Sequence, residues 1–107
     1  MKQGARKLLL ATGLAAACAL PGWAAGATHT VTIEGMKFVP GTVTVKRGDK
    51  VVWQNKDMVP HTATAKGRFD SGNIAAGKSF SRAMTKAGRY DYVCTFHPGM
   101  KAVVVVQ

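Results

Sequence analysis

Short segments that alternate between polar and apolar residues are the feature that most restricts how this chain can fold. Threonine alternates with valine or isoleucine at residues 30–33 and 42–45, and a period of two is the pattern of a strand with one buried face. Further strands are expected at residues 51–55, 62–66, 79–84, 89–94 and 102–106. About seven short strands without a sustained helical period predict an all-β sandwich or barrel.

The first 27 residues resemble a cleavable secretory signal in composition. Basic residues precede an apolar run at 8–20, and the small residues of a cleavage site follow, ending at Ala27. No other segment approaches the roughly 20 apolar residues of a membrane helix. We therefore expect residues 1–27 to be removed and residues 28–107 to form one exported, periplasmic domain without a transmembrane segment. The alternative is a lipoprotein anchored through Cys18, although alanine stands where that signal usually has leucine.

Cysteine usage points to a metal. The expected domain has roughly 80 residues, near the size at which a hydrophobic core alone is barely sufficient. The chain has two cysteines, and Cys18 leaves with the signal, so Cys94 has no disulfide partner. A single cysteine in an exported domain suggests intermolecular pairing, reactivity or metal binding. A bound metal is the stabilising link that remains.

The expected domain is basic. Residues 28–107 keep 12 of the 15 basic residues and all five acidic residues, which gives a formal net charge of about +7. So basic a chain usually suggests nucleic acid, but an exported protein seldom meets it, and we expect no such partner. The basic residues are spaced singly, which is typical of a solvated surface. The alternative is electrostatic steering toward an acidic protein or a membrane surface.

One segment near the C-terminus carries three candidate metal ligands. Strand alternation places Tyr90, Tyr92 and Cys94 on one face, which we expect to point inward. We expect the chain to turn through the Pro-Gly pair that follows His97, and Met100 comes directly after that pair. A thiolate with two imidazoles and a weak axial thioether is the donor set of a blue-copper electron-transfer site.

The second imidazole has to come from elsewhere in the chain. The expected domain offers only His29 and His61 besides His97. His61 follows Pro60 at the start of an expected strand, whereas His29 lies next to the expected new N-terminus. His61 is therefore the better candidate.

Other residues near these ligands have ordinary interpretations. We interpret Met36, Met58 and Met84 as packing residues, with Met58 a rival axial ligand because it lies three positions before the candidate histidine. Lys56 and Asp57 are interpreted as ordinary loop charges.

The pattern Cys94-x-x-His97-x-x-Met100 with an upstream Pro60-His61 resembles the cupredoxins, in particular the amicyanin, plastocyanin and pseudoazurin group. The resemblance covers essentially the whole expected domain, through matching residues at 38–40, 43–45, 48–49, 52–55, 69–72, 77–80 and 88–94. It implies a Greek-key β-sandwich of about seven or eight strands. It also implies one type 1 copper ion, cycling between Cu(I) and Cu(II), with His61, Cys94, His97 and Met100 as its ligands.

Two residues depart from the family pattern. Thr62 stands where the family commonly has an asparagine that tethers the two ligand-bearing segments, and the shorter threonine is expected to tether them less well. Phe96 stands where the family often has proline, at the expected partner-facing surface. Backbone N–H groups near Thr62 and Thr95 are expected to donate hydrogen bonds to the Cys94 sulfur.

The resemblance implies a monomeric one-electron carrier rather than an enzyme. Its partner is expected to be an acidic redox protein, such as a c-type cytochrome or a dehydrogenase. The alternative function is a periplasmic carrier that sequesters and hands over copper itself. A cysteine hydrolase would leave Met100 without a role, and three histidines cannot supply the trinuclear centre of a multicopper oxidase.

Overall fold

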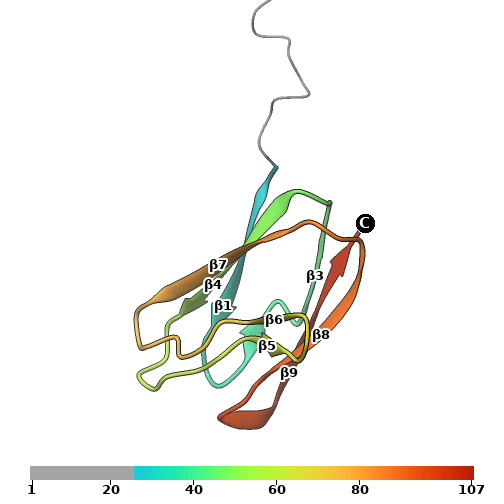
Figure 1. Cartoon of the computed structure of the whole chain (residues 1–107). Coiled ribbons are helices and arrows are strands. Elements are labelled where there is room, and N and C mark those ends of the chain that lie inside the picture. The colour runs from blue at the N-terminus through green and yellow to red at the C-terminus, as the bar shows by residue number, and fades with distance from the viewer. Residues whose placement is uncertain (1–25) are drawn as a thin grey trace, which may run out of the picture.

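Two β-sheets lie face to face in the computed structural model, which describes residues 26–107 (Figure 1). One sheet has the strand order β2-β1-β4-β7, and the other has the order β3-β9-β8-β5-β6. The strands are β1 (Thr28–Ile33), β2 (Phe38–Val39), β3 (Thr42–Val45), β4 (Asp49–Asn55), β5 (Thr64–Ala65), β6 (Phe69–Asp70), β7 (Ser79–Met84), β8 (Gly88–Cys94) and β9 (His97–Val106). The expected all-β sandwich is confirmed. Across residues 26–107 there is no helix of the length and hydropathy needed to cross a membrane.

The described residues contain more strands than the alternation pattern predicts. The two extra strands, β2 and β6, have two residues each, which is too short for a period of two to be recognised. Strand β5 is shorter than the expected segment 62–66, and β9 begins five residues before the expected segment 102–106. The expected signal at residues 1–27 lies outside the described residues, apart from Gly26 and Ala27.

The core between the sheets is built around Trp53. Alternation along β4 and β8 directs every second side chain inward, and Trp53 on β4 is fully buried. Its ring centroid lies 5.5 Å from that of Tyr92 on β8, 5.4 Å from that of Phe69 and 5.7 Å from that of Phe80. These offset and edge-on contacts are the favourable aromatic arrangements. The contact with Tyr92 joins the two sheets close to Cys94, the last residue of β8.

The two ends of the sandwich have different contents. Strand β1 runs parallel to β4, and β3 runs parallel to β9. The start of β1 and the C-terminus therefore lie at one end, and the β8–β9 turn lies at the opposite end (Figure 1). The start of β1 and the C-terminus are thus separated from the segment that carries the candidate ligands.

Asp49 closes the end of the sandwich at which β1 starts and β9 ends. Its Oδ1 accepts the Ala27 N–H at 2.9 Å, and its Oδ2 accepts the Lys46 N–H at 2.9 Å. The Nε2 atom of His29 lies 2.8 Å from the same Oδ2. The Lys46 N–H and the His29 ring lower the pKa of the Asp49 carboxyl to about 2. His29 therefore serves this junction, which agrees with the preference for His61 as the candidate ligand.

We expect Asp49→Asn to destabilise the fold at neutral pH and to remove part of its acid sensitivity. The folded carboxyl has the lower pKa, so its contribution is fully present above the unfolded value of about 4 and is lost as the pH falls through about 2. Urea unfolding of both proteins from about pH 6 to 2 measures this. The difference in free energy of unfolding should shrink toward the acid end, and a constant difference would contradict the assignment.

Candidate metal centre

The β8–β9 hairpin carries three of the expected ligands. Cys94 ends β8 and pairs with His97, the first residue of β9, across a two-residue turn at 95–96. The register then shifts, and residues 98–100 have no partner in β8, as in a bulge. The turn expected at the Pro-Gly pair is therefore wrong in position. The tight turn comes before His97, and the Pro-Gly pair belongs to the bulge.

Burial differs sharply along this hairpin. Cys94 is free and fully buried, and Tyr90 and Tyr92 are buried on the same face, which confirms the inward direction expected from alternation. Met100 is also buried, because the bulge returns β9 to the core at that residue. His97, which lies between Cys94 and Met100 in the sequence, is half-buried. The hairpin therefore offers two buried sulfur atoms and one imidazole closer to solvent.

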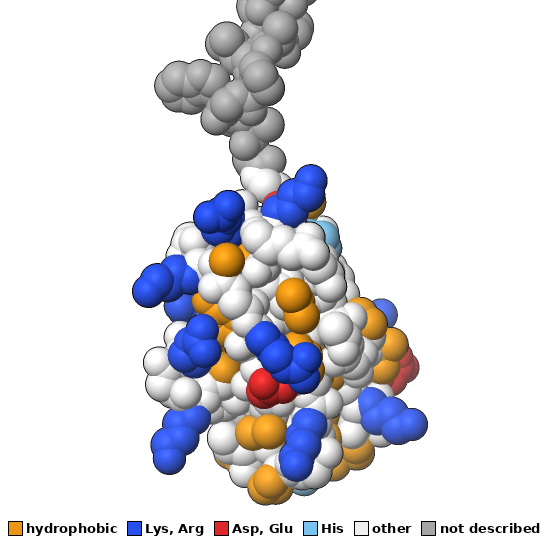
Figure 2. All heavy atoms as spheres, turned by 90° about the vertical axis from the view of Figure 1, so that its right-hand side faces the viewer, with side chains coloured by type: hydrophobic (Ala, Val, Ile, Leu, Met, Phe, Trp, Pro, Cys, Tyr) orange, Lys and Arg blue, Asp and Glu red, His pale blue; other side chains and the backbone are white. Residues whose placement is uncertain are grey.

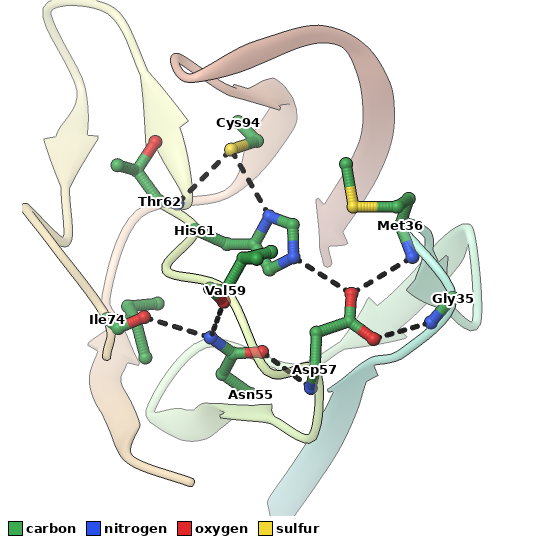
Figure 3. A network of polar contacts seen from close by, with 9 residues as sticks. All are labelled: Gly35, Met36, Asn55, Asp57, Val59, His61, Thr62, Ile74 and Cys94. Carbon is green, nitrogen blue, oxygen red and sulfur yellow. Dashed lines mark hydrogen bonds and ion pairs between the residues drawn. The ribbon is translucent and has the colours of Figure 1, made fainter. Parts of the chain in front are cut away.

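His61 reaches the hairpin from the other side of the same sandwich end. Its backbone is fixed by a bridge to Ile74, with the His61 N–H donating to Ile74 O at 3.1 Å and the Ile74 N–H donating to His61 O at 2.8 Å. Its side chain is fully buried, and Nδ1 lies 3.6 Å from the Cys94 sulfur (Figure 3). The thiol can donate to this nitrogen when Nδ1 carries no proton.

The four expected ligands differ in how closely the structure places them to one another. His61 and Cys94 are in contact. The ring of His97 lies edge-on to that of His61, with centroids 5.3 Å apart. Met100 is buried in the core cluster that also contains Cys94. Within residues 26–107, no three His, Cys, Asp or Glu side chains converge closely enough to hold an ion by themselves.

The donor set fits a soft transition metal. Metal–nitrogen distances near 2.0–2.1 Å and metal–sulfur distances near 2.3 Å, as for zinc, are typical of such sites, so one ion can contact both atoms across the 3.6 Å between His61 Nδ1 and the Cys94 sulfur. Thiolate, thioether and imidazole are the donors that copper takes in blue-copper sites. Among residues 26–107, the hydrogen-bond partners of the Cys94 sulfur are the Thr62 N–H and the His61 ring and include no carboxylate, so hard cations such as magnesium or calcium do not suit the site.

Asp57 has a role that the sequence interpretation missed. It is not an ordinary loop charge, because its Oδ2 lies 2.8 Å from Nε2 of the buried His61 (Figure 3). It also accepts backbone N–H groups from Gly35 at 2.7 Å and Met36 at 3.0 Å. Burial acts to raise the pKa of Asp57, but the hydrogen bonds from Met36, His61 and Gly35 hold that pKa below its usual value. The spacing of four residues before a candidate histidine was the only signal in the sequence.

A threonine network joins the two ligand-bearing segments. Thr62 N–H donates to the Cys94 sulfur at 3.4 Å, as expected. Thr95 N–H does not do so, because it donates to the Thr62 hydroxyl at 2.9 Å. That hydroxyl also lies 3.1 Å from the Thr95 hydroxyl and accepts a bond from Thr64 at 3.0 Å. The short side chain of Thr62 therefore tethers the two segments directly through Thr95, and a tether weaker than that of asparagine stays a prediction.

Two of the methionine interpretations are wrong. Met84 is buried, as expected of a packing residue. Met58 is 92% exposed and Met36 is 42% exposed, so neither packs in the core. The exposure of Met58 also removes support for it as an axial ligand, because nothing in its environment holds its sulfur beside the buried thiol.

Comparison with known proteins shows which family the chain belongs to. Residues 24–107 match the family model described as copper binding proteins of the plastocyanin/azurin family. The chain is 34% identical to amicyanin-alpha of Methylorubrum extorquens, over 95% of this chain and 99% of that protein. It is also 34% identical to amicyanin of Paracoccus versutus, over 72% of this chain and 63% of that protein's length.

Solved structures show the same architecture. The copper(I) form of an amicyanin variant superimposes with a TM-score of 0.71 at 33% identity, over 80% of this chain and 88% of the variant. Because the family match extends over all of the described residues, the fold and the cofactor class follow together. The chain is a cupredoxin, a member of the plastocyanin/azurin family of copper-binding proteins, with copper as its cofactor.

Proposed function

We propose that this protein is an exported one-electron carrier whose copper ion is bound by His61, Cys94, His97 and Met100. The observation that carries the proposal is the contact between Nδ1 of His61 and the Cys94 sulfur, 3.6 Å apart and both fully buried. Bound copper supplies a one-electron couple between Cu(I) and Cu(II). The chain supplies two donors whose backbones are paired, His61 with Ile74 in a β-bridge and Cys94 with His97 in the β8–β9 hairpin.

A fixed donor arrangement favours electron transfer over metal release. The Cys94 sulfur accepts the Thr62 N–H, which disperses negative charge on the sulfur and holds it in place. The His61 ring is bonded at both nitrogens. These contacts limit how far the donors move when the oxidation state changes. A copper carrier would need donors that open to solvent, whereas the Cys94 and His61 side chains are closed from it.

His97 is the proposed route for the electron between the site and a partner. It is the only half-buried imidazole on the hairpin, and it follows Phe96, whose side chain is 51% exposed. Pro98 and Gly99 are also exposed. We infer that this apolar surface, defined by Phe96, Pro98 and Gly99, contacts the redox partner.

The rest of the surface favours an acidic partner. Figure 2 shows Lys and Arg side chains spread singly over one face of the molecule, with few acidic side chains among them. Residues 28–107 carry a formal charge of about +7, and such a field speeds association with a negatively charged protein. An acidic c-type cytochrome or dehydrogenase in the periplasm would meet this requirement. Export rests on the signal-like residues 1–27, and the released domain is proposed to be a monomer.

We expect the oxidised, copper-loaded protein to be intensely blue or green, because the Cys94 thiolate bonded to copper gives a charge-transfer band. Cys94→Ser should abolish the colour while Thr85→Ser, a control outside the hairpin, should keep it. The absorption spectrum after stoichiometric copper addition measures this. A wild-type protein that binds Cu(II) without colour would refute the type 1 assignment.

We expect Met100→Leu to keep the colour and to raise the reduction potential, since a weak sulfur donor that favours Cu(II) is lost. Leucine conserves volume and polarity at this buried position. Cyclic voltammetry of both proteins gives the potentials. An unchanged potential would mean that Met100 is a core residue and not an axial ligand.

We expect the association rate with an acidic redox partner to fall steeply as ionic strength rises, because exposed charges are screened within about 10 Å at 0.1 M salt. Stopped-flow mixing with an acidic c-type cytochrome over a salt series tests this. A rate that does not change with salt would assign docking to the apolar surface at Phe96 alone.

A further inference from the structure

We propose that Asp57 is a positioning residue of the metal centre, which fixes the His61 ring so that Nδ1 faces Cys94. The inference rests on the proposed function, because it takes His61 as a ligand. It goes beyond that function by assigning a residue that touches no metal. Asp57 contacts His61 on one side and backbone N–H groups of the β1–β2 turn on the other.

The first contact fixes the protonation pattern of the ring. An ionised carboxylate can only accept a hydrogen bond. Since Oδ2 of Asp57 lies 2.8 Å from Nε2 of His61, that nitrogen carries the proton and Nδ1 is left with a free lone pair. Nδ1 is the nitrogen that lies 3.6 Å from the Cys94 sulfur (Figure 3). Asp57 therefore selects the one tautomer that can bind a metal beside Cys94.

The second set of contacts fixes Asp57 itself. The hairpin turn between β1 and β2 points two consecutive N–H groups at the carboxylate, from Gly35 to Oδ1 at 2.7 Å and from Met36 to Oδ2 at 3.0 Å. Consecutive N–H groups of this kind form a small anion-binding nest. On the other side, the Asp57 N–H donates to Oδ1 of the buried Asn55 at 2.9 Å. The carboxylate is thus held from the turn and from its own loop.

The conformation of the turn supports this role. Gly35 and Met36 both have φ near 63°, as the two central residues of a type I′ hairpin turn require. The Met36 side chain is 42% exposed and lies outside the core. The left-handed conformation directs the backbone N–H of Met36 at Asp57, to which it donates a hydrogen bond.

The negative charge has a consequence for the metal. A carboxylate that accepts the proton of a ligating imidazole makes the imidazole a stronger donor. A stronger donor with a nearby negative charge favours the more highly charged ion, so Asp57 should stabilise Cu(II) relative to Cu(I). Removing the charge should therefore raise the reduction potential. Loss of such a partner typically weakens metal affinity by about 10–100-fold.

Three variants separate positioning from charge. In Asp57→Asn the remaining oxygen can still accept from Nε2 of His61, but the charge and the acceptor for the Gly35 N–H are gone. In Asp57→Ala both the hydrogen bond and the charge are gone. Asp91→Asn is the matched control, because it removes an equal charge from an exposed ion pair with Arg89, 3.1 Å long. Each protein is studied metal-free and copper-loaded.

The metal-free readout is ¹⁵N NMR of the His61 ring near pH 8, where an ordinary imidazole is neutral. Wild type, Asp57→Asn and Asp91→Asn should show the single tautomer protonated at Nε2, and Asp57→Ala should show a mixture. In the copper-loaded proteins, Asp57→Ala should lose about 10–100-fold in Cu(II) affinity. Asp57→Asn should have a higher potential than Asp91→Asn, by about 59 mV for each tenfold loss of preference for Cu(II).

Two results would overturn the inference. One is a wild-type ring that is not predominantly protonated at Nε2. The other is Asp57→Ala with the single Nε2-protonated tautomer and the Cu(II) affinity of the wild type. Asp57→Asn with the potential of Asp91→Asn would overturn the effect assigned to the charge, and the wild-type tautomer keeps the test decisive even if Asp57→Ala does not fold. Failure of the proposed function is recognised separately, because His61→Gln would then leave the colour and the copper affinity of the wild type unchanged.

Discussion

A buried imidazole with partners on both nitrogens is the constraint around which the metal end of this protein is organised. A polar ring closed from water is costly unless its nitrogens are paired, and His61 meets this with Asp57 on one side and Cys94 on the other. Each partner is itself held, Asp57 by the β1–β2 turn and Cys94 by the N–H of Thr62. The ring is therefore held in one orientation, and its two hydrogen bonds connect the loop of Asp57 to the end of β8.

The sandwich provides the frame for that arrangement. Trp53 joins the sheets through contacts with aromatic residues of both, and Cys94 continues the inward face of β8 directly beyond Tyr92. Because close-packed interiors resist displacement, core packing holds the Cys94 sulfur in place at the end of this face. The bulge in β9 then brings Met100 back to the same core after the exposed residues that follow His97.

The two ends of the molecule have different roles. Asp49 and His29 secure the end at which β1 starts and β9 ends, whereas the opposite end holds His61, Cys94 and the exposed Phe96. The chain is basic over its sides and apolar at the hairpin, a combination that suits long-range attraction followed by close contact with a partner. Thr62 shows how a departure from the family pattern is accommodated, because its hydroxyl and the Thr95 N–H meet without a longer side chain.

Several features of the protein were fixed by local pattern alone. Alternation in 89–94 gave the inward direction of Cys94, and the spacing of Cys94, His97 and Met100 predicted three of the proposed donors, because these depend on neighbours in sequence. The tertiary structure alone decided the rest. Asp57 meets Gly35 and Met36, which lie 22 and 21 positions earlier, and no local pattern encodes that contact. The two-residue strands, the register shift in β9 and the Thr62–Thr95 bond likewise arise from pairing between distant segments, whose geometry is set by packing of the whole sandwich.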